Sequence, residues 1–117
     1  MEHNKQAYIT EYNRISEEVS QLETDLLRMR TDPGKLAIQK EIDAYSDRLS
    51  TMRTAKYVQV VEGPSKDLVY EVLREEQYRG GLIYIIWQSR SNPEDDYNWL
   101  DEENVIQIKL PFQPGFN

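Results

Sequence analysis

The sequence predicts an α+β protein in which a coiled-coil-like, antiparallel helical hairpin precedes a small, mostly antiparallel sheet of three or four strands. Three observations lead to this prediction. Apolar residues recur at helical spacing through the first half of the chain, a Pro-Gly pair interrupts them, and short β-branched runs follow. The 117 residues are within the usual size of one domain, so we expect a single folding unit over residues 1–117.

The first apolar stripe predicts a helix over residues 4–30. Its members are spaced alternately by four and three residues, which is the heptad period at which side chains face a partner helix. Mostly charged and polar residues stand between them, as expected for a solvated helix face. The stripe consists of Tyr8, Tyr12, Ile15, Val19, Leu22, Leu26 and Met29.

A second stripe has the same spacing but does not continue the first. A seven-residue step from Met29 reaches Leu36, which is absent from the second stripe. The segment between the stripes is Thr31-Asp32-Pro33-Gly34, and proline is favoured at the start of a helix, here after an aspartate cap. We therefore expect a tight reversal, with residues 4–54 forming the hairpin. The second stripe consists of Ile38, Ile42, Tyr45, Leu49 and Met52.

The length of the hairpin predicts self-association. Its first helix would be about 40 Å long, whereas the remaining ~60 residues would form a globule about 27 Å across. The hairpin should therefore project from the body and leave flanking apolar residues such as Ile9, Leu27 and Leu36 uncovered. Because a lone two-helix hairpin is marginal in water, we expect copies to pair through the stripe residues into a homo-oligomer. The alternative is that the C-terminal half folds back along the hairpin.

Residues 55–117 carry the β-structure. Residues 57–61 are β-branched and aromatic and end at a Gly-Pro pair, so they are typical of a strand. Residues 82–88 are almost continuously apolar, which predicts a strand buried on both faces. Residues 105–110 alternate, with Ile106, Ile108 and Leu110 on one side, and predict a half-exposed strand.

Two segments of this half leave alternatives open. Residues 66–79 begin after a capping Ser65 and end at Gly80, which slightly favours a third helix, but their apolar run also suits the return strand of a hairpin. The arm over residues 111–117 contains two phenylalanines and two prolines. It can dock either on a neighbouring molecule or on its own domain.

The composition argues against several classes of function. The net charge is −7, with −2 in residues 1–54 and −5 in residues 55–117, and no basic cluster suits duplex nucleic acid or an anionic membrane. The chain has no cysteine and no apolar run near the ~20 residues that span a bilayer, so we expect a cytoplasmic protein. With His3 as the only histidine, a catalytic Ser-His-Asp triad and a zinc site are both disfavoured. We expect no enzyme and no cofactor.

Residues 92–104 contain six carboxylates and no basic residue, which we interpret as a solvated connection rather than a metal site, because the EF-hand pattern is absent. Tyr, Trp and Arg are enriched at binding hot spots, and Arg beside an aromatic ring can hold a phosphate-bearing ligand. The candidate ligand or partner contacts are Arg28, Arg79, Arg90, Tyr97 and Trp99.

We therefore expect a non-catalytic, oligomeric protein-binding or assembly protein, such as a viral or bacterial accessory factor. In general layout, a helix pair followed by a small antiparallel sheet is similar to viral sponge proteins that sequester immune signalling nucleotides. That resemblance implies the alternative of a nucleotide-like ligand held where subunits meet. A third hypothesis is an acidic mimic of nucleic acid, and a carboxylate-based hydrolase ranks last.

Overall fold

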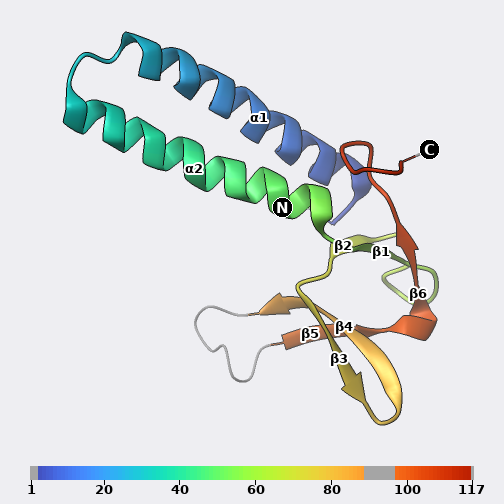
Figure 1. Cartoon of the computed structure of the whole chain (residues 1–117). Helices are drawn as coiled ribbons and strands as arrows, with labels where there is room; N and C mark the ends of the chain where they lie inside the picture. Colours follow the sequence, from blue (N-terminus) through green and yellow to red (C-terminus); the bar gives the residue numbers. More distant parts are fainter. Residues whose placement is uncertain (1–2, 89–96, 117) are drawn as a thin grey trace.

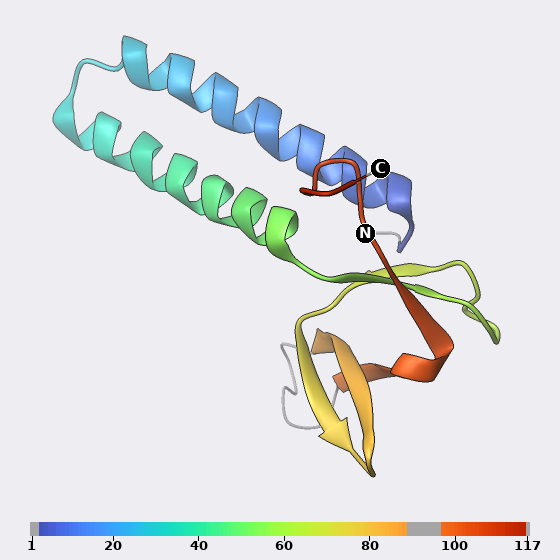
Figure 2. The ribbon, with the colours of Figure 1, turned by 45° about the vertical axis from the view of Figure 1, so that its right-hand side comes forward.

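A computed structural model describes residues 3–88 and 97–116 (Figure 1). Two packed helices are followed by two small antiparallel sheets of three strands each, so the predicted α+β class is confirmed. The described part of the molecule measures 57 × 37 × 22 Å, because the hairpin projects from the β-containing body (Figures 1 and 2). No helix in this part of the chain is long and apolar enough to cross a membrane.

The hairpin consists of α1 (Lys5–Arg28) and α2 (Asp32–Thr54). At the start of α1 the Asn4 side chain accepts a hydrogen bond from the backbone N–H of Ala7. The cap of α2 differs from the expected aspartate. Thr31 is the cap, and its hydroxyl accepts a hydrogen bond from the Gly34 N–H at 3.2 Å. The predicted reversal between the two stripes is confirmed.

The first sheet, sheet A, has β1 at its centre and both neighbours antiparallel to it. Tyr57 of β1 lies between Glu71 of β2 and Ile108 of β6. Two of the predicted strands are therefore present here, over slightly shorter ranges than expected. The strands of sheet A are β1 (Tyr57–Val60), β2 (Val69–Glu71) and β6 (Val105–Ile108).

The second sheet, sheet B, has β4 at its centre. Ile83 and Ile85 of this strand are buried and their neighbours are half-buried, in keeping with the predicted strand covered on both faces. A 3₁₀ turn, η1 (Glu102–Asn104), returns the chain to sheet A. The strands of sheet B are β3 (Arg74–Tyr78), β4 (Gly81–Gln88) and β5 (Tyr97–Asp101).

The favoured third helix over residues 66–79 is wrong, because this segment contains β2 and β3. Asp67 has a φ of 73°, in the left-handed region, and it reverses the chain against β1. Its N–H donates to the Val60 carbonyl oxygen at 2.8 Å, and the Val60 N–H donates to the Leu68 carbonyl oxygen at 2.9 Å. The alternative of a return strand is therefore correct for its first part, and the chain then crosses into sheet B.

The solvated connection that we expected over residues 92–104 also differs from the structure, which contains a strand there. Residues 92–96 lie outside the described part, residues 97–101 form β5, and η1 follows. β5 pairs with β4, and the register places Trp99 opposite Ile85. Aromatic residues favour strands, and here that preference outweighs the charge of the surrounding acids.

Sheet A is packed on both faces. Towards the hairpin, Tyr57, Val69 and Leu110 form one apolar core with residues from both helices. On the opposite face, Val58, Val60 and Val105 form a second core with side chains that include Tyr84 and Leu100 of sheet B. The hairpin base, sheet A and sheet B therefore follow one another as layers (Figure 2).

The C-terminal arm lies on its own domain, beside the base of α1 (Figures 1 and 2). The ring of Phe112 stacks on Tyr12, with centroids 4.4 Å apart and planes 3° from parallel. Phe112 also meets the edge of Tyr57. Of the two alternatives for this arm, the structure shows docking on its own chain.

Candidate functional site

The twelve predicted interface residues pack within one chain. Seven of them lie towards the base: Tyr8, Ile15, Leu49 and Met52 belong to the main core, and Tyr12, Val19 and Tyr45 pack against it. Leu22 and Ile42, farther along the hairpin, are also buried. All twelve are buried or half-buried: Tyr8, Tyr12, Ile15, Val19, Leu22, Leu26, Met29, Ile38, Ile42, Tyr45, Leu49 and Met52. Their role in contacts between copies stays a prediction.

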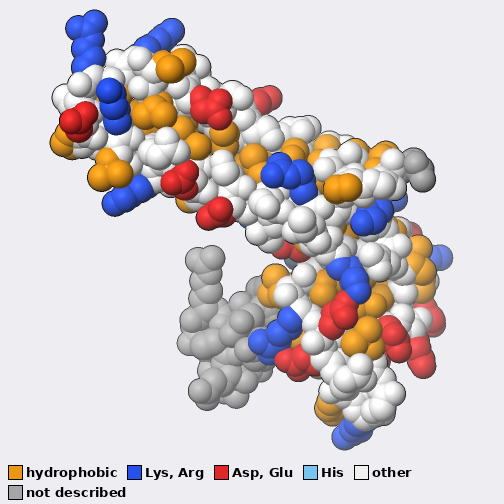
Figure 3. All heavy atoms as spheres, in the orientation of Figure 1, with side chains coloured by type: hydrophobic (Ala, Val, Ile, Leu, Met, Phe, Trp, Pro, Cys, Tyr) orange, Lys and Arg blue, Asp and Glu red, His pale blue; other side chains and the backbone are white. Residues whose placement is uncertain are grey.

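The hairpin tip exposes two leucines outside that seam. Leu27, one residue before the end of α1, is 88% exposed, and Leu36, in the second turn of α2, is 59% exposed. Apolar side chains reach the surface along the hairpin towards its tip (Figure 3). We refer to these two exposed leucines, one on each helix, as the tip patch.

A polar cluster joins the hairpin to sheet A. The Arg48 guanidinium of α2 donates two hydrogen bonds to the carboxylate of Glu71 on β2, at 2.9 and 3.0 Å. Glu11 of α1 lies 3.7 Å from the same guanidinium, and its Oε2 is buried without a hydrogen-bond partner in the described structure. The Tyr57 hydroxyl donates to Glu71 at 3.3 Å, and the Glu71 N–H donates to the Tyr8 hydroxyl at 3.1 Å.

The electrostatics of this cluster fit a structural role. Burial raises the pKa of Tyr8 to about 12 and raises that of Tyr57 as well, so both phenols stay protonated to higher pH than an exposed tyrosine. The hydrogen bonds to Glu71 raise the pKa of Arg48 further above its usual value. Arg48 faces both Glu71 and Glu11, and both phenols hydrogen-bond to Glu71, so we interpret this cluster as the clamp between hairpin and body. Sequence reasoning missed it, because Arg48 and Glu71 carry no mutual spacing signal.

A surface groove of about 310 Å³ lies on sheet B, at the turn between β3 and β4 and beside η1. It brings together Arg79 and Trp99, two of the predicted contacts, and adds Tyr78. The ring centroids of Tyr78 and Trp99 are 5.7 Å apart. Its lining consists of Tyr78, Arg79, Gly81, Leu82, Trp99, Asp101, Glu102 and Glu103.

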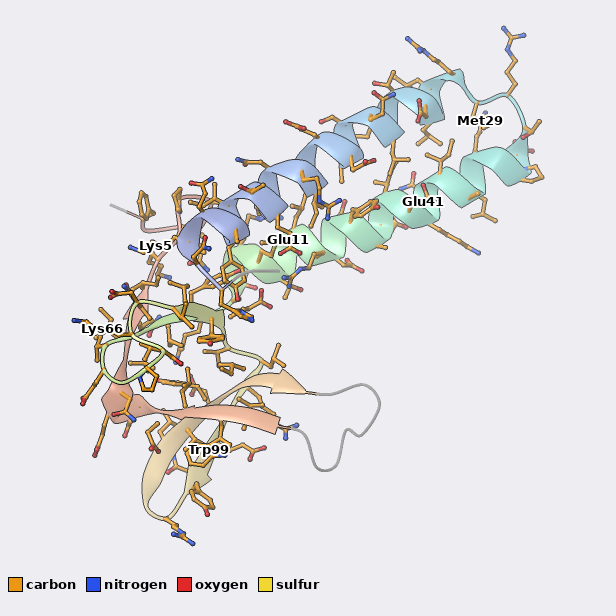
Figure 4. The ribbon with its side chains drawn as sticks, turned by 180° about the vertical axis from the view of Figure 1, so that it is seen from behind. Lys5, Glu11, Met29, Glu41, Lys66 and Trp99 are labelled. Carbon is orange, nitrogen blue, oxygen red and sulfur yellow. The ribbon has the colours of Figure 1, made fainter. Side chains whose placement is uncertain are left out.

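Strand register explains why these side chains meet. Tyr78 pairs with Gly81 and Trp99 pairs with Ile85, so both aromatic residues stand on one face of sheet B with Ile83 between their partners. The turn residues Arg79 and Gly80 have φ values of 51° and 79°, as a two-residue hairpin turn requires. Trp99 lies far from the hairpin tip, which Met29 marks (Figure 4).

Of the remaining predicted contacts, Arg28 lies away from this groove, and the other two fall outside what the structure describes. Arg28 ends α1 at the hairpin tip, away from sheet B (Figure 1). Arg90 lies outside the described residues. Tyr97 begins β5, and its side chain is also outside the described part. Within residues 3–88 and 97–116, no group of three or more His, Asp or Glu side chains is placed to hold a metal ion.

Comparisons with known proteins supply no relative from which a role can be transferred. No protein-family model matches the chain, and no match was found among curated proteins or among solved structures.

Proposed function

We propose that this is a non-catalytic, cytoplasmic protein that self-associates through its helical hairpin and presents its β-containing body to another protein. The observation that carries the proposal is the tip patch on a projecting hairpin, with Leu27 88% and Leu36 59% exposed. Burying a leucine side chain is worth about 2 kcal/mol, so two copies gain most by covering these side chains against each other.

The size of the hairpin supports this arrangement. The 24 residues of α1 span about 36 Å, and two adjacent helices are about 20 Å wide, so one face offers about 700 Å². A stable protein interface uses about 800 Å² from each partner, and the outer half of this face supplies only about half of its area, so we expect a weak, reversible contact. We therefore propose that two hairpins lie side by side with their tips level, so that the tip patch of one copy meets that of the other.

The base of the hairpin cannot contribute equally. Phe112 of the C-terminal arm covers Tyr12, and sheet A covers Tyr8, so the apolar side chains at this end are already sheltered within one chain. The outer half of the hairpin has no such cover from the described residues. Association through the outer half is also consistent with a body that remains free to bind another molecule.

The alternative of a nucleotide-like ligand has less support. Arg79 and Trp99 would supply a cation and a stacking surface, but Asp101, Glu102 and Glu103 line the same groove. Carboxylates repel the phosphates of such a ligand. A sponge for signalling nucleotides would therefore need a site other than this groove.

Self-association is tested by the molar mass from light scattering over a dilution series. We expect a dimer that dissociates at low concentration. Replacing both tip leucines, Leu27→Glu and Leu36→Glu, should give a monomer throughout, because the contact would lose apolar side chains and gain like charges. The control is Leu73→Glu in the body, where the leucine is 55% exposed. A wild-type protein that is monomeric at all concentrations would contradict the proposal.

A further inference from the structure

The groove on sheet B combines a hollow, an exposed aromatic pair and unpaired negative charge. Tyr78 and Trp99 are 47% and 45% exposed, although each has a large apolar ring. The centroids of the Tyr78 and Trp99 rings are 5.7 Å apart and the ring planes are tilted by 51°, so the two rings are neighbours rather than scattered side chains. A ring surface that remains open to solvent is available to a ligand.

The charges of the groove identify the ligand as a cation. Among the described lining residues, three carboxylates, those of Asp101, Glu102 and Glu103, stand against one guanidinium, that of Arg79. The ion pairs among the described residues involve Glu11, Glu71, Glu75 and Glu76, and none uses these three carboxylates. The groove therefore carries negative charge that its described lining residues do not neutralise.

Arg79 shows how the rings accept such a ligand. Its guanidinium carbon lies 5.2 Å from the centre of the Tyr78 ring, within the range of a cation–π contact. Trp is the ring that attracts cations most strongly, and no cation of the described structure occupies the Trp99 ring. A second cationic side chain can therefore be placed on Trp99, with the three carboxylates nearby.

We propose that this groove binds a lysine or arginine side chain from a basic, extended segment of a partner protein. A cavity of about 310 Å³ is at the small end of ligand sites, so it suits one long cationic side chain rather than a folded element. The carboxylates attract the charge and the two rings contact the aliphatic stem and the head group. The inference deepens the proposed protein-binding role, because it names the chemistry of the partner.

The test uses hexa-arginine as the probe and isothermal titration calorimetry of the whole protein. Trp99→Ala should weaken binding about tenfold, the effect of losing a desolvated cation–π contact. Because Trp99→Ala can also disturb sheet B, the isosteric pair Asp101→Asn and Glu103→Gln serves as a second variant, and it should also weaken binding about tenfold.

The matched control removes the same charge elsewhere. Glu17→Gln and Glu18→Gln lie on the exposed surface of α1, and this pair should keep the affinity within about twofold. Equal weakening by both pairs would overturn the proposal, because binding would then follow net charge alone. Binding of ATP in place of the peptide, or no binding of hexa-arginine at low salt, would also overturn it.

Failure of this inference is distinguishable from failure of self-association. The variant with Leu27→Glu and Leu36→Glu changes the molar mass but leaves the groove intact, so it should bind hexa-arginine with the wild-type affinity. Conversely, the Asp101→Asn and Glu103→Gln pair should leave the molar mass of the dimer unchanged. Loss of peptide binding in the tip variant would show that the groove is not an independent site.

Discussion

The side-chain amide of Gln113 donates a hydrogen bond to the backbone carbonyl oxygen of Ala55, 2.7 Å away, and so ties the C-terminal arm to the end of α2. The same amide nitrogen lies 3.2 Å from the Met52 carbonyl oxygen, and its oxygen accepts from the Leu110 N–H at 3.0 Å. The last carbonyl groups of a helix have no partner within it. Gln113, only 5% exposed, satisfies them from the far end of the chain.

Replacing Gln113 by alanine should lower the free energy of unfolding by about 1–3 kcal/mol, because buried carbonyl groups lose their donor. Urea unfolding followed by circular dichroism measures the change. Gln107→Ala, at an exposed position of β6, is the control and should have little effect. A Gln113→Ala protein as stable as this control would show that the arm does not hold the end of α2.

Arg48 should be the most sensitive residue of the clamp. Arg48→Met leaves the carboxylate of Glu71, only 12% exposed, without its cation, so we expect a loss of about 2 kcal/mol of stability. Arg48→Lys should be intermediate, because lysine keeps the charge but not the paired geometry. If both variants unfold at the wild-type urea concentration, the clamp contributes nothing to stability.

The hairpin was predictable because its signals are local. The alternating spacing from Tyr8 to Met29 predicts a helix, and the Pro33-Gly34 pair predicts the reversal that follows it. Both signals come from residues close together in the sequence. Residues 66–79 could not be assigned in the same way. Ser65 and Gly80 suit the two ends of a helix, whereas the apolar run between them also suits a strand. There the strand pairing of β2 with β1, and of β3 with β4, decided the outcome.

The sites depended on distant contacts, which explains what sequence reasoning missed. Arg79 and Trp99 were named as contacts, but only the register of β3, β4 and β5 brings them together with three carboxylates. Arg48 and Glu71 are 23 residues apart in the sequence, and Gln113 and Ala55 are 58 residues apart. Neither separation is a helical or strand period, so neither contact could be predicted from the composition or the residue pattern.

Alkaline pH should destabilise the protein through Tyr8. Burial raises the pKa of this phenol from 10.0 to about 12 in the folded state. Between these values the unfolded chain loses the proton while the folded protein retains it, so stability is complete below pH 10 and falls as the pH rises towards 12. Tyr8→Phe should make the stability fall less steeply over this window, measured by urea unfolding at several pH values. An unchanged slope would contradict this role for Tyr8.

The side-by-side hairpin dimer is tested most directly by distances between copies. The chain has no cysteine, so Arg30→Cys at the hairpin tip or Lys66→Cys in the body introduces one spin label per molecule. Pulsed electron–electron double resonance spectroscopy should then give a short, narrow distribution of distances between the labels at position 30 of the two copies. Labels at position 66 should be farther apart, and the tip contact should vanish with Leu27→Glu and Leu36→Glu. The absence of any distance between labels at position 30, at concentrations where the mass is that of a dimer, would contradict pairing through the hairpins.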